Sequence, residues 1–101
     1  MSEEISPAYA ELLGKTARIS WAELAPFFAR GKLLLVDPAQ DLIGVAIAII
    51  EDDKPVVTKL MQNNLLLKVD DRKALDFNDR DPELWATVVS PWVLVQERKP
   101  A

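Results

Sequence analysis

The sequence predicts a single α+β domain, residues 1–101, in which a small three-stranded antiparallel sheet packs with four to five helices. A length of 101 residues fits one domain, and a hydrophobic content of 50% is enough for one packed core. Short apolar runs alternate along the chain with longer segments that begin at helix-capping residues. From the second predicted helix onward, the order of the elements is that of a winged-helix domain.

The first two helices are predicted from their termini. Ser6–Pro7 opens a helix that runs to about Gly14, because serine caps a helix and proline suits its first turn. Ser20–Glu23 has the spacing of a capping box and starts a second helix. Gly31 ends that helix in a left-handed conformation. Pro26 lies inside the second helix, so we expect either a kink or a later start.

The middle of the chain alternates strands and helices. Lys32–Val36 reads as a short buried strand. Residues 42–50 are apolar throughout; their β-branched side chains suggest a strand, but the length of the run favours a helix. Asp53 caps a further helix that ends at Asn63–Asn64. Leu65–Val69 then forms a second strand.

A polar excursion and a long strand complete the domain. Either Asp70 or Asp71 caps a short polar helix that extends to about Asp79. The last strand, Trp85–Gln96, carries no charged residue. Pro91 lies within it and cannot donate a ladder hydrogen bond, so it belongs at a sheet edge or a bulge.

Both faces of this last strand are apolar, because side chains alternate between the two faces of an extended chain. Either helices cover both faces and the tryptophans fill the core, or one face or the strand edge meets a second chain. The second interpretation predicts a protein-interaction or adaptor domain, either a homodimer or a complex with another protein. The predicted interface residues are Trp85, Val89, Trp92, Val93 and Val95.

A second hypothesis is a DNA-binding protein of the winged-helix type. The helix before Leu65–Val69 takes the place of a recognition helix, and its polar side chains are Lys54, Thr58, Lys59 and Gln62. Gln can read adenine edges and Lys can neutralise phosphate. The net charge of −4 and the acidic excursion after Val69 argue against a nucleic-acid partner.

A third hypothesis is a carboxylate- or metal-dependent enzyme. The chain has no His and no Cys, which excludes triads built on either side chain and metal sites built on imidazole or thiolate. Asp76–Asn78 begins like a calcium loop, but the required glycine is missing. Nothing in the spacing of the acidic residues shows two carboxyls held in a cleft, and capping and solvation explain them better. The sequence therefore assigns no catalytic residue, no metal ligand and no cofactor, and a non-enzymatic protein is the leading prediction.

The chain is expected to reside in the cytoplasm and not in a membrane. The N-terminus carries acids where a signal peptide needs basic residues and an apolar core. A chain without cysteine fits a reducing compartment. The apolar runs are shorter than a membrane span.

Four blocks of the chain resemble a known family. They are Thr16–Trp21 (TARISW), Phe27–Gly31 (FFARG), Glu83–Ala86 (ELWA) and Pro91–Gln96 (PWVLVQ). Together they are similar to a family of short bacterial proteins catalogued only as a domain of unknown function. The resemblance implies a bacterial, stand-alone domain and lends no role to any residue.

Overall fold

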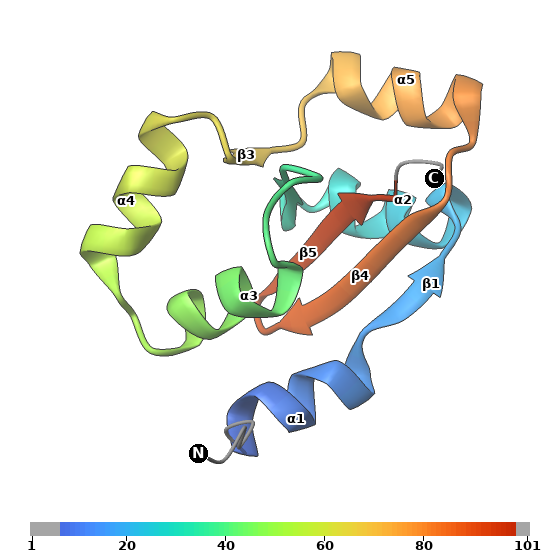
Figure 1. Ribbon diagram of the computed structural model, residues 1–101. Helices are drawn as coiled ribbons and strands as arrows, with labels where there is room; N and C mark the ends of the chain where they lie inside the picture. The colour runs from blue at the N-terminus through green and yellow to red at the C-terminus, as the bar shows by residue number, and fades with distance from the viewer. Residues whose placement is uncertain (1–6, 99–101) are drawn as a thin grey trace.

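The computed structural model describes residues 7–98, which form five helices and five strands (Figure 1). The helices are α1 (Pro7–Lys15), α2 (Trp21–Ala29), α3 (Leu42–Ile50), α4 (Lys54–Gln62) and α5 (Asp71–Arg80). The strands are β1 (Ala17–Ile19), β2 (Leu33–Val36), β3 (Leu66–Lys68), β4 (Leu84–Val89) and β5 (Trp92–Glu97). None of the helices between residues 7 and 98 has the length and hydrophobicity that a membrane span requires.

The strands form one mixed sheet in the order β1-β4-β5-β2-β3. The pair β2–β5 is parallel, and the other three pairs are antiparallel. The predicted three-stranded antiparallel sheet is therefore wrong. The stretch predicted as one last strand is two strands joined by a turn at Ser90–Pro91, whose peptide bond is cis. The three-residue β1 is too short for its pattern to stand out in the sequence.

The winged-helix order does not describe this sheet either. The final strand, β5, inserts between β4 and β2, and runs parallel to β2 at the centre of the sheet. Residues 33–36 of β2 thereby pair with residues 93–96 of β5. The α4–β3 unit, which was predicted to be a recognition helix and a strand, lies at the edge of the sheet.

Helices cover both faces of the sheet. On one face, α1, α3 and α4 pack a core that contains Val36, Leu94 and Ala46, each fully buried. On the other face, α2 and α5 pack a second core around Phe77, Leu24 and Val95. Figure 1 shows α3 in front of β4 and β5, and α2 behind them. The apolar character of both strand faces thus follows from a three-layer arrangement.

The local helix signals operate as the sequence predicts. Ser20 and Glu23 form a complete capping box, in which Ser20 Oγ accepts from the Glu23 amide at 3.3 Å. The helix begins directly at Trp21 even though Pro26 lies inside it, so the later start is wrong. Gly31 adopts a φ of 70° just past the helix end, a conformation that suits glycine. The predicted Ser6 cap lies outside the described residues.

The remaining helices also begin where acids stand in the sequence. Asp41, Asp53 and Asp70 each accept a hydrogen bond from a backbone amide in the first turn of the helix that follows. The helix prediction for residues 42–50 is confirmed, and α3 is buried over most of its surface. Asn64, with a φ of 59°, ends α4 in the left-handed region.

Candidate interaction surfaces

The five predicted interface residues fall into two groups. Val89, Val93 and Val95 are 5%, 4% and 0% exposed, so they are core residues of the single chain and leave no surface for a partner. Trp85 and Trp92 are half-buried, with one part of each ring packed against the core beneath α1 and α3. The alternation pattern identified strongly buried positions correctly, but it did not tell a helix-covered face from a partner-covered one.

Each of these two tryptophan rings lies close to a positively charged side chain. The indole N–H of Trp85 donates to a carboxylate oxygen of Glu83 at 3.0 Å, and the Arg98 guanidinium lies 4.8 Å from the ring centroid. The ammonium of Lys32 lies 5.3 Å from the ring of Trp92. Such cation–π contacts stabilise partly exposed rings modestly. The tryptophans therefore have structural partners within the chain.

An apolar surface does occur at the end of the β4–β5 hairpin. It lines a cavity of about 500 Å³, together with the pair Glu11 and Lys15, which are 3.0 Å apart on α1. We call it the hairpin-end surface and define it by Ile50, Val88, Pro91 and Trp92. Ile50 and Val88 are 53% and 56% exposed, which is high for large apolar side chains.

The backbone at Val88 is also free to pair. Within the antiparallel β4–β5 pair, the Arg98 amide donates to the Glu83 carbonyl at 2.9 Å. In such a pair every second residue bonds to the partner strand, so residues 83, 85, 87 and 89 bond to β5. Val88 lies between two of these positions, and its N–H and C=O therefore point away from β5. On that side β1 pairs only with residues 84–86. Among the described strands, none therefore pairs with Val88 on its outer side, away from β5.

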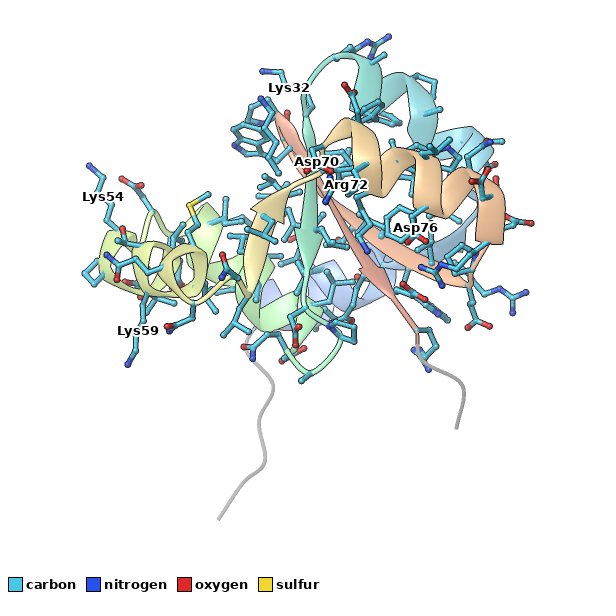
Figure 2. The ribbon with its side chains drawn as sticks, turned by 90° about the horizontal axis from the view of Figure 1, so that it is seen from above. Lys32, Lys54, Lys59, Asp70, Arg72 and Asp76 are labelled. Atoms are coloured by element: carbon cyan, nitrogen blue, oxygen red, sulfur yellow. The ribbon has the colours of Figure 1, made fainter. Side chains whose placement is uncertain are left out.

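The residues predicted to read DNA project from α4. Lys54, Thr58, Lys59 and Gln62 are all exposed. Lys54 makes a weak contact with Asp52, at 4.0 Å between two strongly exposed groups. Figure 2 shows Lys54 and Lys59 on the far side of β3 from Arg72, so the basic residues of the two regions do not form one continuous positive face.

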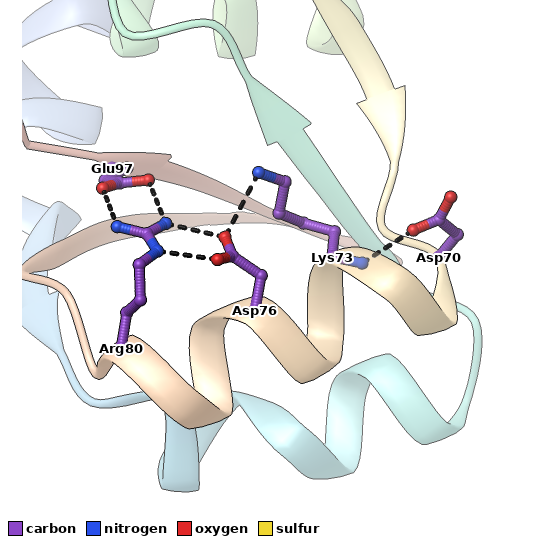
Figure 3. Close-up of polar contacts among 5 residues, drawn as sticks. All are labelled: Asp70, Lys73, Asp76, Arg80 and Glu97. Carbon is purple, nitrogen blue, oxygen red and sulfur yellow. Dashed lines mark hydrogen bonds and ion pairs between the residues drawn. The ribbon is translucent and has the colours of Figure 1, made fainter.

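The acidic residues cap helices or form ion pairs. The carboxylate of Asp70 accepts from the Lys73 amide at 2.9 Å. Arg80 donates to both oxygens of Asp76 at 2.7 Å and to both oxygens of Glu97 at 2.8 and 3.0 Å (Figure 3). In residues 7–98, no group of three acidic side chains is placed to hold a metal ion.

The ion network around Arg80 shifts the titration of its members. Hydrogen bonds from Arg80, aided by the charges of Arg80 and Lys73, lower the pKa of Asp76 from 3.8 to about 2 against a smaller opposing effect of burial. The same guanidinium lowers the pKa of Glu97. Both carboxylates are therefore anions at neutral pH, and the network ties the end of α5 to the end of β5.

Comparison with known proteins places the chain in a family. A family model described as a protein of unknown function, DUF2288, matches residues 7–97. The chain belongs to the DUF2288 family. A solved structure, the NMR solution structure of PA1075 from Pseudomonas aeruginosa, is similar to this DUF2288 chain over 99% of its length and 93% of the other chain. The identity is 55% and the TM-score 0.82. Comparison with curated proteins gives no match.

Sequence reasoning missed two exposed apolar residues of this DUF2288 protein. Val88 stands in the run predicted as one strand, where alternation alone gives it a buried face. Ile50 ends a helix that is buried nearly throughout. The one available signal was Pro91, which marks the point where the ladder breaks and a turn begins.

Proposed function

We propose that this DUF2288 protein is a non-enzymatic protein-interaction domain that forms a homodimer through the hairpin-end surface. The observation that carries the proposal is the exposure of Ile50 and Val88 beside Pro91 and Trp92. Apolar patches rimmed by polar residues are typical of interfaces. Here Glu11 and Lys15 form such a rim.

The apolar side chains of this surface are gathered in one place. Among the residues whose exposure the structure describes, the other strongly exposed large apolar residues are distributed over α4, β3 and α5: Val56, Met61, Leu67 and Leu75. At the hairpin end, by contrast, Ile50 and Val88 line the same cavity as a half-buried tryptophan. Burying them against another chain removes apolar area from water, at about 25 cal/mol for each Å².

Two features favour a second copy of this chain as the partner. A two-fold axis placed beside Val88 lets the free backbone groups of two β4 strands pair with each other in antiparallel fashion. The rim carries one acid and one base, Glu11 and Lys15, so two copies related by the same axis are complementary in charge. The surface is therefore self-complementary both in backbone hydrogen bonding and in charge.

The non-enzymatic part of the proposal rests on side-chain chemistry. The chain lacks His, the commonest general base, and Cys, which carries the only thiol side chain and is a strong nucleophile. Asp70 and Asp76 are engaged in a cap and an ion network. These contacts give both acids a structural role, and neither has a demonstrated catalytic role.

Sedimentation of the purified chain over a wide concentration range tests the proposal, with Val88→Lys and Ile50→Lys as variants. Because both sites are exposed, the variants should keep the wild-type circular dichroism and raise the dimer dissociation constant by about tenfold or more. Val56→Lys is the matched control, since Val56 is 43% exposed on α4, and it should dimerise like the wild type. A wild type that stays monomeric up to millimolar concentration contradicts the homodimer. A dissociation constant that neither Val88→Lys nor Ile50→Lys changes contradicts this interface.

A further inference from the structure

A second surface, separate from the hairpin end, is a groove between β3 and α5. Its volume is about 450 Å³. We call it the α5 groove; its lining residues include Leu35, Leu67, Lys68, Arg72 and Lys73. Leu67 is 42% exposed and Leu35 is partly exposed, so the groove offers apolar contact area to a ligand.

The net charge of the groove's lining is positive, because Lys68, Arg72 and Lys73 stand against two acids. Asp76 forms ion pairs with Arg80 at 2.7 Å and with Lys73 at 3.4 Å, and Asp70 accepts from the Lys73 amide as the cap of α5. Arg72 is exposed and has no ion pair within residues 7–98. The net charge of the protein is −4, so this positive groove differs from the chain as a whole. An unpaired guanidinium beside apolar side chains can bind a carboxylate of a ligand.

The backbone of β3 offers one further contact. The Val69 amide donates to Leu33 O and the Asp37 amide donates to Leu65 O, both at 3.0 Å. By the alternation of an antiparallel pair, the N–H and C=O of Lys68 face away from β2. The neighbouring outward position, Leu66, is 1% exposed, so the accessible part of this edge is at Lys68, beside the groove.

We propose that the α5 groove binds an extended, acidic segment of a partner protein. An apolar side chain of the segment packs on Leu35 and Leu67, and an Asp or Glu pairs with Arg72. The segment's backbone exchanges hydrogen bonds with Lys68, in the manner of strand addition to a sheet edge. A nucleic acid fits less well, because none of the groove's lining residues is aromatic and bases have no ring to stack on.

The inference goes beyond the homodimer, because the groove and the hairpin-end surface share no lining residue. The probe is a displayed library of random twelve-residue linear peptides, selected on the full chain and counter-selected on Arg72→Glu. Selected peptides are then titrated into wild type, Arg72→Glu and Lys68→Pro. Lys68→Pro removes the outward N–H, a change that edge strands tolerate, but it also removes the lysine charge. Lys68→Gln, which loses the charge and keeps the N–H, is its matched control. Lys59→Glu on α4 is the control for net charge.

The expected result is a set of peptides that contain Asp or Glu and alternate apolar with polar residues. Arg72→Glu should weaken them about tenfold or more, Lys68→Pro about fivefold, and Lys59→Glu less than twofold because of distance and salt screening. Amide exchange at Lys68 should slow in the complex. The proposal is wrong if no selected peptide loses affinity on Arg72→Glu. It is also wrong if the amide chemical-shift changes on peptide binding map to the hairpin-end surface, or if single-stranded RNA displaces the peptides.

Discussion

The strands β5 and β3 both contain a run of aliphatic residues, but the run in β3 is partly exposed. In β5, Val93, Leu94 and Val95 are 4%, 0% and 0% exposed. In β3, Leu66 is 1% exposed but the adjacent Leu67 is 42% exposed. Val95, Leu35 and Leu67 lie in register on one face of the sheet, and exposure rises along this row from the central β5 to the edge strand β3. Leu66 points to the opposite face, where the core beneath α3 and α4 covers it. A run of aliphatic residues therefore predicts a strand, and the place of that strand in the sheet together with the helix cover on each face decides how much of it water reaches.

The largest expected effect comes from placing a charge in each of these two strands. Val95→Lys puts an ammonium at a fully buried site without a partner, and should lower the free energy of unfolding by about 4 kcal/mol or more. Leu67→Lys, at an exposed site, should change it by less than about 1 kcal/mol. Urea denaturation followed by fluorescence measures both. Equal losses for the two variants would contradict the contrast between centre and edge.

A smaller effect, of opposite sign, is expected next to β5. Thr87 on β4 faces Leu94, is 1% exposed, and its hydroxyl has no hydrogen-bond partner. Thr87→Val keeps the branched shape and removes the unpaired hydroxyl, so it should raise the free energy of unfolding by about 1 kcal/mol. Thr58→Val, at an exposed position of α4, is the control and should change stability little. A destabilised Thr87→Val would indicate that the hydroxyl has a partner after all.

The smallest effect concerns the end of β5, where Arg80 links Glu97 to Asp76. The pKa of Asp76 is about 2 in the folded chain against 3.8 for an unperturbed Asp, so its charge stabilises the fold above pH 3.8. That contribution is lost as the pH falls through about 2. Asp76→Asn should therefore be less stable than wild type at pH 7, and this difference in stability should disappear between about pH 4 and pH 2.

The same acid titration of Asp79→Asn provides a control on the same helix. Asp79 is exposed, and the ion pairs found within residues 7–98 do not include it. Thermal unfolding at several pH values compares the three proteins. A gap between wild type and Asp76→Asn that stays constant down to pH 2 would show that the carboxylate charge does not contribute.

Much of the local structure could be predicted from the sequence. The capping box at Ser20, the caps at Asp53 and Asp70, and the ends of helices at Gly31 and Asn64 all lie where the pattern indicated. These signals act between residues two to four positions apart, so no distant contact is needed to produce them. The helix inside 42–50 was decided by length alone, and the structure confirms it.

The candidate surfaces were predicted less well. Of the proposed interface residues, Trp92 lies at the hairpin-end surface, while Val93 and Val95 are core. The alternation of apolar residues signals that both strand faces are covered, but helices and a second chain leave the same pattern. Arg72 could not be singled out from the sequence, because its significance depends on neighbouring acids that are already paired with other groups.

The sequence by itself determined the α+β class, the helix boundaries, the absence of His and Cys chemistry, and the presence of an aliphatic C-terminal strand region. Only the tertiary structure decided that this region folds back at Ser90–Pro91, and that residues 93–96 pair in parallel with residues 33–36. Capping acts between neighbours along the chain, whereas strand pairing joins segments about sixty residues apart. That long-range pairing makes β3 an edge strand, and Leu67 is exposed there.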